Sequence, residues 1–228
     1  MMTHSILTTL LLPLAAVGFG LFIAIIFKPT VNKAVKLLLS FSGAFLLAIT
    51  VFDFLPEVYK EADSYIGIFI MAGLLLQILL EFGSGGAEHG HIHNKSDAKF
   101  PVLLFLSLCA HSFIEGFPLA ENTELLYGIV VHKIPIAIII SAFLLQADLS
   151  KVKTTIFLIG FAVMTPLGAF AKASLPILQS YTHYTNAFVV GVLLHVATTI
   201  LFESSKNHQF NASKFLAIIL GIVLAYFI

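Results

Sequence analysis

Several residues that can bind metal ions or carry protons lie inside stretches that are otherwise apolar. His111 and Glu115 are four residues apart, so a helix places both on one face, one turn from each other. Asp53 and His132 stand in two further apolar stretches. A centre of two imidazoles and two carboxylates suits a borderline divalent ion such as Zn²⁺. The residue types therefore indicate metal chemistry.

Three more ionisable residues are candidates for an ion or proton path. Lys133 directly follows His132, while His195 and Glu203 share a later apolar stretch. An ionisable side chain inside a membrane span costs about 2.5–3.5 kcal/mol even on lenient scales, and usually has a function. Pro118 and Pro135 each lie close after a histidine and remove a helical hydrogen-bond donor, which weakens the helix there.

Each of these residues also has a purely structural explanation. His195 can be a hydrogen-bonded packing residue, and Asp53 can lie at the membrane interface. Lys133 can form a structural salt bridge with Glu115 or Asp53. Three histidines in a polar segment, His89, His91 and His93, can belong to a solvated linker.

Composition defines the elements that must position these residues. Of the 228 residues, 59% are hydrophobic and 11% are charged, with a net charge of zero. A soluble domain is about one quarter charged, so a soluble enzyme, a nucleic-acid binder and a disordered chain are excluded. The single cysteine, Cys109, excludes a disulfide within the chain. We predict a polytopic, all-α membrane protein.

Eight apolar runs are long enough, or nearly so, to be membrane helices of about 20 residues. They cover residues 5–27, 34–57, 64–82, 99–120, 124–147, 153–175, 185–204 and 212–228. The connections are short, so we expect one transmembrane domain over 1–228. Only the loop 83–98, which holds the three spaced histidines, has a polar character of its own.

The lysines predict the orientation of the chain, because cytoplasmic connections retain positive charge. The odd-numbered connections hold nine of the twelve lysines and the even-numbered ones hold two. Both termini are therefore expected outside, with the histidine-containing loop in the cytoplasm.

Three motifs in order resemble the ZIP (Zrt/Irt-like) family of divalent-metal transporters over essentially the whole chain. FDFLPE at 52–57 is similar to the family's HLLPE, with Asp53 at the histidine position. HSFIEG at 111–116 and HKIP at 132–135 are similar to its motifs on the fourth and fifth helices. The resemblance implies eight helices in a 3+2+3 arrangement, with helices 1–3 and 6–8 as inverted repeats.

The resemblance also implies a transport site. Its metal ligands correspond to Asp53, His111, Glu115 and His132, on helices 2, 4 and 5. Many members hold a second metal ion beside the first, but Ser112, Lys133 and Ile136 stand here at three positions where its ligands are common. We therefore expect one transported ion, with the ammonium of Lys133 in place of the second.

The expected function is import of divalent transition metals, zinc foremost, without a prosthetic group. Glu57 is the expected entrance relay, and His195 and Glu203 are expected exit relays. His89, His91 and His93 are expected to bind metal in the cytoplasm. The expected surroundings are a bacterial cytoplasmic membrane and its lipids, with no nucleic-acid partner. The oligomeric state is open, with a homodimer as one option.

Two other classes remain as alternatives. An intramembrane metal-dependent hydrolase needs an open metal position and a group that handles protons. Glu115 or Asp53 can supply that group, but the chain lacks an HExxH motif. A passive metal-sensing membrane protein is the second alternative, and metal flux separates it from a transporter. Iron, manganese, cadmium and nickel also remain open as substrates.

Overall fold

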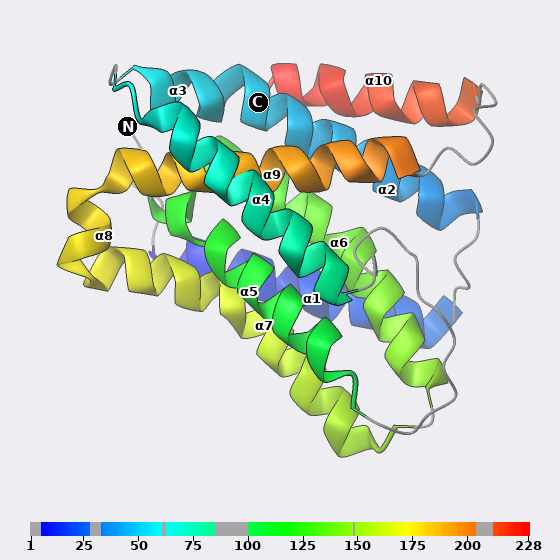
Figure 1. Cartoon of the computed structure of the whole chain (residues 1–228). Coiled ribbons are helices and arrows are strands. Elements are labelled where there is room, and N and C mark those ends of the chain that lie inside the picture. Colours follow the sequence, from blue (N-terminus) through cyan, green and yellow to red (C-terminus); the bar gives the residue numbers. More distant parts are fainter. Residues whose placement is uncertain (1–5, 28–32, 61–62, 85–99, 148, 204–211) are drawn as a thin grey trace.

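The computed structural model describes all residues except 1–5, 28–32, 61–62, 85–99, 148 and 204–211. In this described part every regular element is a helix, which confirms the all-α prediction (Figure 1). The elements are α1 (Ile6–Phe27), α2 (Lys33–Ile49), η1 (Thr50–Phe54), α3 (Leu55–Tyr59), α4 (Ile66–Ser84), α5 (Val102–Glu115), η3 (Phe117–Ala120), α6 (Thr123–Gln146), α7 (Lys151–Ser174), α8 (Pro176–Ser180), α9 (Thr182–Glu203) and α10 (Ala212–Tyr226).

Seven helical segments in the described residues are long and apolar enough to cross a membrane. One of them, Ala34–Tyr59, joins most of α2 to η1 and α3. The eighth predicted span corresponds to α10, a shorter apolar helix of 15 residues. The predicted runs therefore identify the correct segments, with ends that differ by a few residues.

Successive long helices run in alternating directions along the bundle (Figure 1). The helix α1 begins at the end of the bundle where α3 and α8 lie, and α10 runs back toward that end. We call this end of the molecule, which holds α3 and α8, the α8 end.

The long helices pack as two groups of four. In the first group α4 lies along α9, α10 lies along α2, and α2 also contacts α9. In the second group α1 contacts α6 and α7, and α5 contacts α7. The groups meet chiefly where α2 contacts α6 and α4 contacts α5.

Glycines allow two of these helix pairs to approach very closely. A Cβ atom on Gly73 of α4 would overlap the carbonyl oxygen of Phe188 on α9, and one on Gly191 of α9 would overlap that of Ile70. Gly116 and Gly168 make a similar reciprocal contact where the end of α5 meets α7. Small residues are the usual means of bringing membrane helices together.

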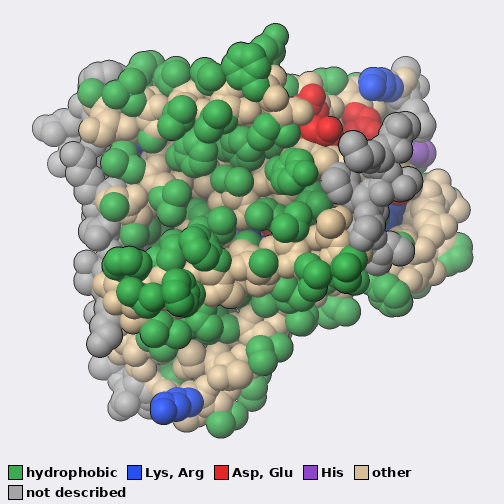
Figure 2. Space-filling view, turned by 180° about the vertical axis from the view of Figure 1, so that it is seen from behind, with side chains coloured by type: hydrophobic (Ala, Val, Ile, Leu, Met, Phe, Trp, Pro, Cys, Tyr) green, Lys and Arg blue, Asp and Glu red, His purple; other side chains and the backbone are tan. Residues whose placement is uncertain are grey.

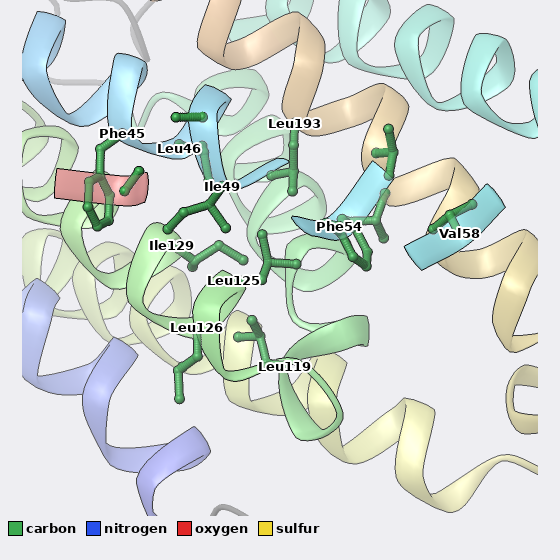
Figure 3. Close-up of a cluster of buried hydrophobic side chains, with 14 of the residues drawn as sticks. Phe45, Leu46, Ile49, Phe54, Val58, Leu119, Leu125, Leu126, Ile129 and Leu193 are labelled. Atoms are coloured by element: carbon green, nitrogen blue, oxygen red, sulfur yellow. The ribbon is translucent and has the colours of Figure 1, made fainter. Parts of the chain in front are cut away.

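Buried apolar side chains fill the space between the two groups. Figure 3 shows Leu46 and Ile49 of α2 beside Leu125 and Ile129 of α6, with Leu193 of α9 nearby. The face seen in Figure 2 is also largely apolar. An apolar core inside an apolar exterior is what a bundle surrounded by lipid requires.

The three prolines near the predicted site act differently on their helices. Before Pro56 the backbone forms the π-helix η1, in which the N–H of Leu55 donates to the carbonyl of Thr50. Before Pro118 the helix α5 ends at Glu115 and the 3₁₀ helix η3 follows. In contrast, α6 continues through Pro135, so the weakening expected there produces no break. The π-helix η1 was not among the elements expected from the sequence.

Candidate metal centre

His111 and Glu115 lie together on α5, deep inside the bundle. Their side chains are about 3% and 1% exposed, and Nε2 of His111 is 3.4 Å from Oε2 of Glu115. The predicted sharing of one helix face is therefore confirmed.

Gln77 of α4 contacts the other ring nitrogen of His111. Its Oε1 atom lies 3.1 Å from Nδ1 of His111, and Gln77 is fully buried. An amide oxygen only accepts hydrogen bonds, so Nδ1 of His111 donates to Gln77, and Nε2 is the ring nitrogen that faces Glu115. Metal-binding histidines are commonly oriented by such a partner.

Lys133 of α6 supplies a positive charge to the same carboxylate. Its Nζ atom donates to Oε1 of Glu115 and, at 3.1 Å, to Oγ of Ser112. The ammonium also lies 4.7 Å from the ring centroid of Phe161 on α7, within cation–π range. Thr165 Oγ1 donates to the same Glu115 oxygen at 2.9 Å.

The two oxygens of Glu115 thus have different partners. Oε1 accepts from Lys133 and Thr165, and Oε2 faces the imidazole of His111. Of the structural alternatives considered for Lys133, the structure contains the salt bridge with Glu115.

The other two predicted metal ligands lie in neighbouring elements. His132 is buried on α6 directly before Lys133. Asp53 is exposed within η1, where the charges of Glu124 and Glu57 act on it. In the described part of the chain, no three His, Cys, Asp or Glu side chains are close enough to hold one ion. Of the four predicted ligands, the structure pairs His111 with Glu115.

Two of the expected relay residues, Glu57 and His195, have side-chain partners in the described part of the chain. Glu57 is exposed and accepts a hydrogen bond from Nδ2 of Asn122 at 2.9 Å. His195 pairs through Nε2 with Glu81 of α4, and Thr199 Oγ1 is 3.4 Å from the same nitrogen. Glu203 ends α9, but its side chain lies outside the described residues, as do His89, His91 and His93.

Gln77 and Glu81 on α4 and Thr165 on α7 were not among the predicted site residues. Gln77 and Glu81 are four residues apart in the apolar run 64–82, so the criterion that selected His111 and Glu115 also applies to them. Thr165 gave no comparable signal, because threonine is common in membrane helices as a local hydrogen-bonding residue.

Residues 83–228 match the family model described as "ZIP Zinc transporter". This match covers more than half of the chain. The chain belongs to the ZIP zinc transporter family. The resemblance inferred from three motifs is confirmed, and the matched region includes HSFIEG and HKIP but begins after FDFLPE. Membership supports metal-ion transport by a multi-pass membrane protein.

Two curated relatives carry the name "Zinc transporter ZIP1". The protein from Danio rerio is 32% identical over 91 residues, which is 37% of this ZIP chain and 30% of the fish protein. The match thus spans less than one third of that relative. The protein from Plasmodium falciparum (isolate 3D7) is 23% identical over an alignment covering 86% of this chain and 79% of the relative.

Proposed function

We propose that this chain imports divalent transition-metal ions, zinc foremost, into the cytoplasm of a bacterial cell across the cytoplasmic membrane. The observation that carries the proposal is the pair formed by Nε2 of His111 and Oε2 of Glu115, 3.4 Å apart. With Nδ1 of His111 bound to Gln77, Nε2 and a carboxylate oxygen of Glu115 face each other, and both are atoms that can bind a metal ion. The two atoms repel unless a cation, either a proton or a metal ion, lies between them.

The spacing of this pair suits zinc. Ligands at about 2.0–2.2 Å from a tetrahedral ion are about 3.4 Å from one another, the separation of these two atoms. His132, buried on the adjacent helix, and Asp53 are the proposed additional ligands. They would complete the site when the ion arrives, in a step that brings η1 toward α5.

Lys133 takes the role of a second cation in this proposal. Its ammonium holds Oε1 of Glu115, the oxygen that a bridging carboxylate would give to a second metal ion. The other oxygen remains directed at His111. One transported ion per site is therefore the proposed stoichiometry.

The proposed route crosses the bundle from the α8 end, which we place outside because of the lysine distribution. An ion enters past Glu57, binds at His111 and Glu115, and leaves past the His195–Glu81 pair. Glu203 and the loop histidines His89, His91 and His93 are the proposed later steps of the inward route. Helices 1–3 and 6–8 are the proposed inverted repeats, which commonly move against each other around a central site.

Zinc uptake into proteoliposomes that contain a zinc-sensitive dye tests the proposal. We expect wild-type protein to take up zinc and His111→Ala to lose at least about tenfold in rate, because loss of even a hydrogen-bonding partner of a metal ligand costs about 10–100-fold. His208→Ala, outside the apolar runs, is the matched control. Folded wild-type protein that moves no zinc or other divalent ion would contradict transport, and the hydrolase and sensor alternatives would then be tested.

A further inference from the structure

An apolar pocket of about 420 Å³ lies where the first turns of α4 and α9 meet η3. Five aromatic side chains and one threonine form its walls, and none of the six is charged: Phe69, Phe117, Tyr181, Tyr184, Thr185 and Phe188. The helices α4 and α9 belong to the first group of four, whereas η3 follows α5 of the second group. The pocket therefore lies at the boundary between the two groups.

The pocket opens on the face of the bundle that α4 covers. Its lining residues Phe69 and Tyr181 are 37% and 53% exposed, and Figure 1 shows α4 in front of α9, at the periphery of the bundle. Because α4 is long and apolar enough to cross a membrane, its exposed face meets lipid. Acyl chains are therefore the groups available at the mouth of this pocket.

An acyl chain suits this lining better than water or a void. Empty apolar volume destabilises a protein in proportion to its size, and an enclosed water molecule needs several polar partners. The hydroxyl of Thr185 is already engaged, since it accepts from Lys172 at 2.8 Å and donates to the carbonyl of Thr182 at 2.9 Å. The pocket surface is thus almost entirely apolar.

The ammonium of Lys172 lies behind the wall that Thr185 forms. Lys172 is 1% exposed, and its three N–H donors go to the hydroxyls of Thr182 and Thr185 and to the carbonyl of Leu178. The charge of Glu121 also acts on this ammonium. Lys172 thus has no donor left for a ligand. Instead it holds the wall in place before a ligand binds, which lowers the cost of binding.

A fixed carboxylate, that of Asp63, lies beside the pocket. The hydroxyl of Tyr184 donates to Oδ2 of Asp63, and the backbone N–H of Tyr65 donates to Oδ1 at 2.9 Å. These bonds, that of Tyr184 foremost, hold the pKa of Asp63 below its usual value, so the carboxylate is charged at neutral pH. His183 opposes this charge only when its ring is protonated. Asp63 precedes α4, at the level where lipid headgroups are expected.

We propose that this pocket binds a phospholipid of the phosphatidylethanolamine class, with one acyl chain between Phe69 and Phe117 and the primary ammonium on Asp63. An ammonium donates charge-assisted hydrogen bonds to a carboxylate. A choline headgroup has no N–H to donate, and a phosphatidylglycerol headgroup brings only negative charge toward Asp63. The bound lipid contacts both groups of helices at their boundary. This site is separate from the metal centre and does not depend on the proposed function.

Fluorescence quenching by brominated acyl chains tests whether lipid occupies the pocket. The protein contains no tryptophan, so a single introduced tryptophan reports on one place. Phe69→Trp reports on the pocket. Phe170→Trp, on α7 near the α8 end, is the matched control, because Phe170 is 64% exposed and is not among the lining residues.

The two tryptophans are compared in nanodiscs whose phosphatidylethanolamine and phosphatidylcholine are all brominated. Phe69 is less exposed than Phe170, at 37% against 64%, so lipid around the bundle alone would quench Phe69→Trp less. We expect equal or stronger quenching of Phe69→Trp, because an acyl chain inside the pocket contacts it from a second side. Weaker quenching there would overturn occupation of the pocket by lipid.

The headgroup is tested by changing which lipid carries bromine. A small fraction of brominated phosphatidylethanolamine, phosphatidylcholine or phosphatidylglycerol, with identical acyl chains, is added to unbrominated phosphatidylcholine. At Phe69→Trp we expect phosphatidylethanolamine to bind about threefold more tightly than phosphatidylcholine, as one exposed ion pair allows. Phosphatidylglycerol should bind less tightly than either. Phe170→Trp should show no such preference, and an equal preference at both positions would overturn the inference.

Asp63→Asn in the Phe69→Trp protein should abolish the preference for phosphatidylethanolamine, and Asp63→Glu should retain most of it. Circular dichroism and elution volume identify the variants that fold. A preference that persists in folded Asp63→Asn, or tighter binding of phosphatidylglycerol, would overturn the role of the ammonium. All measurements use metal-free protein, so their outcome is independent of zinc uptake.

Discussion

Lys133 and Glu115 are oppositely charged side chains that are both almost completely buried, at 2% and 1% exposure. Removing one partner of a buried pair typically costs about 3–5 kcal/mol, because it leaves the other charge uncompensated. The hydroxyls of Ser112 and Thr165 add charge-assisted hydrogen bonds to the pair, one accepted from Lys133 and one donated to Glu115. The contact thus makes the stability of this region depend on a cation beside Glu115.

Lys133→Met should therefore destabilise the metal-free protein by about 3–5 kcal/mol. Zinc should restore part of the loss, since a bound cation again compensates Glu115. Thermal unfolding in nanodiscs, with and without Zn²⁺, measures both effects.

The double variant Lys133→Met with Glu115→Gln is the control for this prediction. It removes both charges, so it should be more stable than Lys133→Met alone and should gain less from zinc. A single variant as stable as wild type would show that the pair contributes little to folding.

At the scale of elements, the crossing of α4 and α9 depends on two glycines in reciprocal contact. Gly73 faces the backbone of Phe188, and Gly191 faces that of Ile70. No rotamer change relieves an overlap with backbone, so the helices themselves must separate to admit a methyl group. Gln77 and Glu81 belong to α4 and His195 belongs to α9. The crossing therefore also keeps these side chains close together.

We expect Gly73→Ala to separate α4 from α9 and destabilise the protein by about 1–3 kcal/mol. Gly67→Ala on the same helix is the matched control, because nothing lies within 4 Å of its added Cβ atom. Alanine there should be neutral or slightly stabilising through helix propensity. Equal unfolding temperatures for the two variants would contradict the close contact.

The helices were predictable from sequence because apolar runs report directly on burial in lipid. His111, Glu115 and Lys133 were also predictable, since an ionisable residue in such a run is costly. The π-helix η1 was not predictable, because hydropathy does not show which backbone carbonyl accepts the hydrogen bond of each N–H. Asp53 lies exposed within this π-helix. The hydrogen bond that Gln77 accepts from His111 and the one that Thr165 donates to Glu115 depend on how separate helices are rotated, which one sequence does not show.

At the scale of the whole molecule, the alternating helices sort the connections into two sets at opposite ends. The lysine distribution predicts that the set at the α8 end lies outside. Cys109 is buried at 7% exposure, so the parent chain should react slowly with polar thiol reagents. Single added cysteines can therefore report on each end separately.

A membrane-impermeant maleimide applied to intact cells should label Ser64→Cys, at the α8 end, without permeabilisation. It should label Lys151→Cys, at the start of α7, only after the membrane is opened. Both positions are exposed, so protein burial does not protect them. The opposite labelling pattern would reverse the orientation and with it the proposed direction of transport.

The position of Lys133 on α6 has an electrical consequence. The charge of Lys133 is part of the chain, so it makes no net crossing of the membrane in a complete transport cycle. A second metal ion in its place would be released into the cytoplasm together with the first. With one ion per cycle and no coupled counter-ion, two elementary charges cross per turnover. A membrane potential of 100 mV, negative inside, contributes about 2.3 kcal/mol per charge. It therefore favours entry of one divalent ion by about 4.6 kcal/mol. Zinc uptake should thus generate a current and accelerate as the membrane hyperpolarises.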